Sequence, residues 1–155
     1  MREKLLTFGN DFLIETDGGT PAFKVDGKAL RVRDTIQFRD QQGRPLYRVT
    51  ERLLRLKETM VIERDGRKIA SIQKALVTPL RDRFTVRVEG GSPLHVQGNI
   101  FEHEYTITRD GARVATVSKR WFRVRDTYGV EVMPGEDDAF VLAVTAAVDS
   151  IRSRG

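Results

Sequence analysis

Basic side chains beside aromatic ones are the feature of this sequence that most directly suggests chemistry. Cations next to an aromatic ring can hold a phosphate group while the ring stacks on a ligand or enters an interface. Strict alternation along an extended chain would place Trp121 on one face with Lys119, Arg123 and Arg125. The residues that we predict to bind an anion or a phosphorylated headgroup are Lys74, Arg81, Arg83, Lys119, Trp121, Arg123 and Arg125.

The competing interpretation of these residues is a solvated face of the protein, on which long basic side chains cover the tryptophan. The formal net charge of +5 gives acidic partners only a modest attraction. The basic residues are interleaved with 22 acidic ones and form no block of like charge, which argues against nucleic acid as the partner.

A metal site is suggested only superficially, by the two histidines, His95 and His103, together with Glu102 and Glu104. In a β-strand, His103 would point away from both glutamates, and the HExxH helix motif is absent. We therefore expect His103 to be an ordinary strand histidine and expect no metal.

Motifs of enzymes are also missing. The chain has no cysteine, no G-x-S-x-G nucleophile turn and no glycine-rich phosphate loop before a helix. The adjacent carboxylates Asp137 and Asp138 suit the start of a helix better than acid–base catalysis. We expect no catalytic residues, no cofactor and no enzymatic activity.

Length and composition indicate one domain over residues 1–155, with 39% hydrophobic and 32% charged residues. No signal peptide is recognisable, and the longest apolar stretch, residues 139–148, is half of the roughly 20 residues that a spanning helix needs. The absence of cysteine is compatible with a cytoplasmic setting. We expect a cytoplasmic protein, with peripheral attachment to a membrane left open.

Hydrophobic residues alternate with polar ones between turn signals such as Asp65-Gly66 and Asp110-Gly111. Phe84, Val86 and Val88, for example, alternate with polar residues, as in an antiparallel strand with one buried face. About 11 or 12 such strands fit before Pro134. Residues 62–74 and 107–119 repeat one pattern of strand, Arg-Asp-Gly turn, strand and lysine, which predicts two successive hairpins of one barrel.

The period changes at the end of the chain, where residues 138–152 predict a helix. Its residues 139–148 are apolar all round except Thr145. A helix is about 10 Å across with its side chains, and a barrel of about 12 strands is wider than one filled by its own side chains. We therefore predict an all-β chain with one helix, in which the helix fills a closed antiparallel barrel. A short membrane anchor is the alternative, which Asp149 and Arg152 disfavour.

The chain resembles the LURP-one-related family over nearly its whole length. The motifs that carry the resemblance are Val96-Gln97-Gly98-Asn99, His103-Glu104-Tyr105-Thr106-Ile107, Val114-Ala115-Thr116-Val117-Ser118-Lys119-Arg120-Trp121-Phe122, Asp126-Thr127-Tyr128-Gly129-Val130 and Asp137-Asp138-Ala139-Phe140-Val141-Leu142-Ala143. The stretch Thr59-Met60-Val61-Ile62 departs from the family pattern, in which an aromatic residue is expected.

The resemblance implies a 12-stranded barrel around a C-terminal helix, similar to the tubby C-terminal domain and to phospholipid scramblases. Tubby-like domains are associated with phosphoinositide binding and with a link to membranes or transcription, but no lipid-site motif matches this sequence residue by residue. Two functions stay open. One is a non-enzymatic binding or scaffold domain for an anionic headgroup or phosphorylated ligand, and the other is a structural or protein-interaction barrel with no small ligand.

Overall fold

The computed structural model describes residues 2–8, 11–16, 21–30, 33–40, 42–51, 58–74, 82–100, 102–119 and 127–154, with side chains for 35–40, 42–51, 60–73, 83–100, 102–119 and 129–149. These residues form twelve β-strands and one α-helix. The strands are β1 (Arg2–Phe8), β2 (Asp11–Thr16), β3 (Pro21–Leu30), β4 (Arg33–Asp40), β5 (Pro45–Glu51), β6 (Glu58–Arg64), β7 (Arg67–Lys74), β8 (Asp82–Val88), β9 (Leu94–Asn99), β10 (Glu104–Arg109), β11 (Ala112–Ser118) and β12 (Thr127–Val132). The helix is α1 (Asp138–Arg154).

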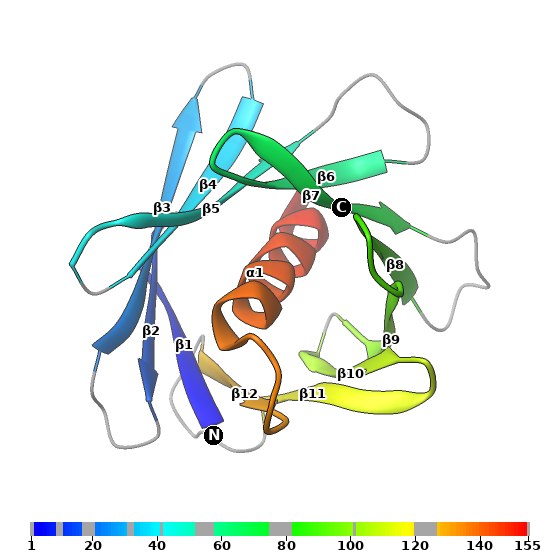
Figure 1. The fold of residues 1–155 in the computed structure, drawn as a ribbon. Helices are drawn as coiled ribbons and strands as arrows, with labels where there is room; N and C mark the ends of the chain where they lie inside the picture. The colour runs from blue at the N-terminus through cyan, green and yellow to red at the C-terminus, as the bar shows by residue number, and fades with distance from the viewer. Residues whose placement is uncertain are drawn as a thin grey trace.

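Each strand pairs antiparallel with the next strand along the chain, and β1 pairs with β12, so that the hydrogen-bonded order closes into a barrel. Residues Lys4 and Gly129 lie opposite each other where the first and last strands meet. Helix α1 runs through the ring of strands (Figure 1) and contacts β4, β5, β6 and β12. The predicted all-β chain with one C-terminal helix packed against an antiparallel sheet is confirmed.

Antiparallel pairing sorts the strand ends into two groups, one at each end of the barrel. Helix α1 begins at the end where β12 finishes, which we call the helix-start end. The same end holds the turns between β2 and β3, β4 and β5, β6 and β7, β8 and β9, and β10 and β11. The other strand ends, including those of β7, β9 and β11, lie at what we call the helix-finish end.

The two repeated segments form equivalent hairpins, β6–β7 and β10–β11. Asp65 and Gly66 have φ angles of 50° and 75°, and Asp110 and Gly111 have 51° and 78°. Aspartate and glycine tolerate this left-handed conformation, which the tight hairpin turn requires. The pairing register also shifts at the matching place in both hairpins, after Ile62 in one and after Ile107 in the other. The predicted repeat therefore extends to backbone geometry.

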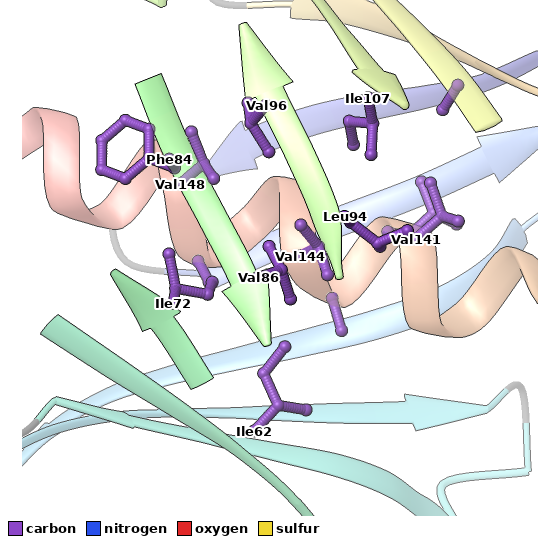
Figure 2. Close-up of a cluster of buried hydrophobic side chains, with 14 of the residues drawn as sticks. Ile62, Ile72, Phe84, Val86, Leu94, Val96, Ile107, Val141, Val144 and Val148 are labelled. Carbon is purple, nitrogen blue, oxygen red and sulfur yellow. The ribbon is translucent and has the colours of Figure 1, made fainter. Parts of the chain in front are cut away.

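Side chains from the inner faces of the strands and from α1 form one apolar core. Phe84, Val86, Leu94 and Ile107 face α1, and Val148 lies near Phe84 in the close-up (Figure 2). Every helix residue from 141 to 149 is buried, which matches the predicted burial of this segment. The helix begins at residue 138 as predicted and ends two residues later than the predicted 152.

Polar side chains fix the start of α1. The carboxylate of Asp137 accepts a hydrogen bond of 3.1 Å from the backbone N–H of Phe140, which is the geometry of an N-cap. A second carboxylate oxygen accepts a hydrogen bond of 2.9 Å from the hydroxyl of Tyr47 in β5. Asp138 lies in the first turn, where negative charge is favourable. The predicted role of both aspartates at the helix start is confirmed.

Candidate functional site

Three of the seven predicted ligand residues lie in the described part of the chain. Lys74 is the last residue of β7, Arg83 is the second residue of β8, and Lys119 directly follows β11. The others, Arg81, Trp121, Arg123 and Arg125, lie outside the described residues. All three described positions lie at the helix-finish end, since β7 and β11 end there and β8 begins there. The topology thus brings predicted basic residues that follow each of the two repeated segments to the same end of the barrel.

These three positions do not converge on one point. Strands β7 and β8 are neighbours, and Lys74 pairs in register with Phe84, next to Arg83. Strands β9 and β10 separate β8 from β11. Strand spacing of about 4.8 Å therefore puts the strands of Arg83 and Lys119 roughly 14 Å apart. The arrangement is a spread of positive charge around the barrel end, and a ligand would have to be large or extended to span it.

Arg83 and Lys119 occupy different parts of this end. Arg83 pairs with Gln97 on β9, and both side chains are exposed on the outer wall. Lys119 follows the buried Val117 by two residues, so strict alternation would turn it toward the core. It is exposed because β11 has ended at Ser118. We expected one basic outer surface. Instead, Arg83 lies on the outer wall of the barrel and Lys119 lies at its rim.

Glu104 holds the end of β11 in place. Its carboxylate accepts hydrogen bonds of 3.0 and 2.9 Å from the hydroxyl of Ser118, which lies opposite it in the hairpin. It also accepts a hydrogen bond of 3.1 Å from the backbone N–H of Lys119. This positioning role was missed from sequence, although the hairpin register, once known, places Glu104 and Ser118 opposite each other.

The prediction that His103 is a strand histidine is wrong. His103 lies in the turn between β9 and β10, with a φ of 52°, and its backbone N–H donates to the carbonyl oxygen of Ile100 at 3.1 Å. Asn99 supports the turn by accepting a hydrogen bond from the backbone N–H of Glu102. The turn has no glycine or proline at these positions, so the sequence carried no strong signal for it.

The same turn reaches the end of helix α1. Nδ1 of His103 lies 3.6 Å from Oδ1 of Asp149, and the two side chains are only 15% and 9% exposed. The two residues form an ion pair when the imidazole is protonated. This contact ties the β9–β10 turn to α1, at the same end of the barrel as the basic positions described above.

The helix-start end has a different electrostatic character. Arg109 donates two hydrogen bonds, of 2.8 and 2.9 Å, to the carboxylate of Glu136. Arg44 forms an ion pair of 2.9 Å with Asp40. Burial and the neighbouring Asp137 carboxylate raise the pKa of Tyr47 to about 12. The charged side chains named here are therefore engaged in a turn and at the start of the helix.

Two properties of the described residues bear on other functions. No group of three or more His, Asp or Glu side chains in that part of the chain is placed to hold a metal ion. No helix there has both the length and the apolar character that crossing a bilayer requires. The side chains of Ser71 and Ser118 are buried, at 3% and 5% exposed.

Comparison with known proteins identifies the class to which this fold belongs. The model of the LURP-one-related family matches residues 1–149, and the chain belongs to that family. It is similar to the uncharacterized protein YxjI of Bacillus subtilis strain 168, with 26% identity over 152 residues that cover 97% of this chain and 91% of YxjI.

The fold is also found in a solved structure. The X-ray structure of a protein from Arabidopsis thaliana matches with a TM-score of 0.74 and 15% sequence identity, covering 97% of this chain and 90% of the other. This likeness concerns the fold alone.

Proposed function

We propose that the protein is a non-enzymatic binding or scaffold domain of tubby-like architecture that binds a phosphate-bearing anion at the helix-finish end. The ligand is an anionic phospholipid headgroup or another phosphorylated molecule, and the protein acts in the cytoplasm or peripherally at a membrane. The observation that carries the proposal is the placement of Arg83 and Lys119 at one end, where both are exposed and neither forms an ion pair with another described residue.

Unpaired, exposed cations are suited to capture phosphate. A guanidinium such as that of Arg83 can donate two parallel hydrogen bonds to phosphate oxygens, and an ammonium such as that of Lys119 adds a mobile point charge. Neither side chain has to break an ion pair within the described part of the chain before it binds. Glu104 engages the backbone N–H of Lys119, so it fixes the chain there and leaves the exposed ammonium for a ligand.

The filled barrel supports binding at the surface. Residues 141–149 of α1 are buried against side chains from the strands, and Leu142, Val144 and Val148 are fully inaccessible to solvent. A ligand the size of a headgroup would have to displace this packing to enter the centre, at a cost of several kcal/mol. Binding at the rim and outer wall requires no such change.

Binding assays with two kinds of probe test the proposal. Vesicles of phosphatidylcholine, with and without phosphatidylserine, report on lipid headgroups, and inositol hexakisphosphate reports on soluble phosphate. We expect binding to at least one anionic probe that weakens as salt is raised and is reduced in Arg83→Gln and Lys119→Gln variants. Equal, negligible binding to all probes would refute the proposal. A pull-down that then recovers one stoichiometric protein would favour the interaction barrel with no small ligand.

A further inference from the structure

The outer wall of β8 and β9 carries a row of side chains that can donate hydrogen bonds. Phe84 and Val86 of β8 point inward to the core (Figure 2), so alternation turns the residues beside them outward. The outward residues, which we call the β8–β9 row, are Arg83, Thr85, Arg87, His95 and Gln97. Thr85 is partly exposed and the other four are exposed. Each of the five side chains has at least one N–H or O–H group to offer a ligand.

The register of the two strands brings the row together. Arg83 lies opposite Gln97, and Thr85 lies opposite His95. Opposite residues of an antiparallel pair have Cβ atoms about 5 Å apart. A rise of about 3.4 Å per residue puts the Cα atoms of Arg83 and Arg87 roughly 13 Å apart along β8. The row is therefore a strip with a guanidinium at each end and Thr85 and His95 at its centre.

The two arginines of the row have no described anionic partner. Arg83 and Arg87 form no ion pair with another residue in the part of the chain that the structure describes. The strands on either side present uncharged residues to the centre of the row, namely Gln73 on β7 and Thr108 on β10. Glu89 directly follows β8 and limits the row toward the helix-start end. Both guanidinium groups are thus available to anions from outside the chain.

The spacing of the arginines indicates what kind of anion fits. A single phosphate group is too small to contact both Arg83 and Arg87. An extended polypeptide advances about 6.8 Å every two residues and points alternate side chains to the same side. Anionic side chains at positions i and i+4 of such a segment therefore recur at the spacing of Arg83 and Arg87, and the side chain between them faces Thr85 and His95.

Other large anions fit the row less well. Its five residues include no apolar side chain that could enter a lipid bilayer. They also include no phenylalanine, tyrosine or tryptophan on which nucleic-acid bases could stack. A row that offers two separated cations and hydrogen-bond donors between them instead matches an acidic polypeptide.

We infer that the β8–β9 row binds an extended acidic segment of another polypeptide, in which two anionic side chains, phosphoserine or glutamate, are four residues apart. A guanidinium can donate two parallel hydrogen bonds to a phosphate or to a carboxylate, so both kinds of side chain fit. The inference rests on the proposed function, with which it shares Arg83, and it names an additional surface and a partner. Arg87 belongs to the row alone, and Lys119 belongs to the proposed phosphate site alone.

Three labelled peptides test the spacing. The first is Ser-Glu-Thr-Ser-Thr-Glu-Ser with a fluorescein label, and the second has phosphoserine in place of both glutamates. The third, Ser-Thr-Glu-Glu-Ser-Thr-Ser, has the composition of the first, but its adjacent glutamates point to opposite sides of an extended chain. By fluorescence anisotropy we expect the second peptide to bind most tightly, because phosphate carries more charge than carboxylate. The third should bind about fivefold more weakly than the first.

Variants with one arginine removed test the residues. We expect Arg87→Gln to weaken binding of the phosphoserine peptide about tenfold, because hydrogen bonds to a charged group are lost. Arg48→Gln is the matched control, since Arg48 is an exposed arginine on β5, lies opposite Glu63, and is separated from β8 by β6 and β7. Arg48→Gln and Lys119→Gln should both stay within about twofold of the parent chain, because screening by salt limits the effect of distant charges.

The outcomes separate this inference from the proposed function. Equal binding of the two glutamate peptides, or an Arg87→Gln variant that binds the phosphoserine peptide like the parent, would overturn the inference. Binding to inositol hexakisphosphate or to anionic vesicles without binding to any peptide would overturn it and retain the proposed function. Peptide binding that depends on Arg87, without binding to those other probes, would retain the peptide partner and remove the site at Lys119. Tighter binding to a single-stranded oligonucleotide than to the phosphoserine peptide at the same salt concentration would replace the polypeptide by nucleic acid. Negligible binding to every probe would overturn both proposals.

Discussion

The hydroxyl of Tyr47 in β5 donates a hydrogen bond of 2.9 Å to the carboxylate of Asp137, the residue that caps helix α1. The two residues are 90 positions apart in the chain. The ring of Tyr47 also packs edge-on against Phe140 in the first turn of the helix, with ring centroids 5.9 Å apart. This contact fixes the start of the central helix to the wall of the barrel.

Removing the hydroxyl should weaken that attachment. We expect Tyr47→Phe to lower the free energy of unfolding by about 1 kcal/mol, because a hydrogen bond to a charged group is lost while the exposed carboxylate regains water. Urea denaturation measures the change. In an Asp137→Ala background the same substitution should have a much smaller effect, and an undiminished effect in that double-mutant cycle would show that the two residues are not coupled.

Alkaline pH should reveal the same contact. Folding raises the pKa of Tyr47 from 10.0 to about 12, so the folded state holds the phenolic proton more tightly than the unfolded state. The resulting stability is present in full below pH 10 and is lost as the pH rises toward 12. The difference in unfolding free energy between the parent chain and Tyr47→Phe should shrink over that window. Tyrosinate absorbance should show a late-titrating phenol that Tyr47→Phe lacks, and its persistence there would contradict the assignment.

Gly98 should resist substitution because of its surroundings. Its φ is +143°, and a Cβ added there would lie 2.6 Å from the carbonyl oxygen of Glu104 and 2.7 Å from the Cα of Tyr105. Both are backbone atoms, so relief requires the paired strands to move. We expect Gly98→Ala to cost about 3 kcal/mol or more. Gly66→Ala is the control, since it has a φ of +75° but open space, and should cost about 1 to 2 kcal/mol in urea denaturation. Equal costs would mean that backbone conformation, and not crowding, dominates.

Leu142 tests whether helix α1 is the core of the barrel. Its side chain is fully buried, so Leu142→Asp places an unpaired charge among apolar groups at a cost of several kcal/mol. We expect loss of the folded state by circular dichroism and gel filtration. Leu142→Met keeps the volume and should cost less than about 1.5 kcal/mol. A monomeric, folded Leu142→Asp protein would contradict the central position of the helix.

Local patterns were sufficient to predict much of the fold. Alternation identified Phe84 and Val86 as inward-facing, Asp65-Gly66 and Asp110-Gly111 located two hairpin turns, and the change of period located α1. These predictions succeeded because each pattern depends on the geometry of a few residues that are neighbours in the sequence. The pair Asp26-Gly27 was misleading, because it lies within β3. The prediction for His103 failed because this residue lies in the turn between β9 and β10 with a left-handed φ. No residue type near His103 in the sequence required a turn there.

The arrangement of the candidate site could not be predicted from the sequence, because it depends on how the strands are ordered in the barrel. Whether Arg83 and Lys119 share an end depends on strand order, and how far apart they lie depends on two intervening strands. Neither quantity is encoded in the spacing of the basic residues along the chain.

Helix α1 follows all twelve strands in the chain, yet its side chains form the centre of the core that those strands surround. During synthesis the strands therefore leave the ribosome before the segment that they must enclose, with their apolar inner faces lacking a partner. The pairing of β1 with β12 also joins segments from opposite ends of the described chain, and such non-local contacts form slowly. We therefore expect nascent chains of this protein to be prone to aggregation until residues 141–149 have emerged.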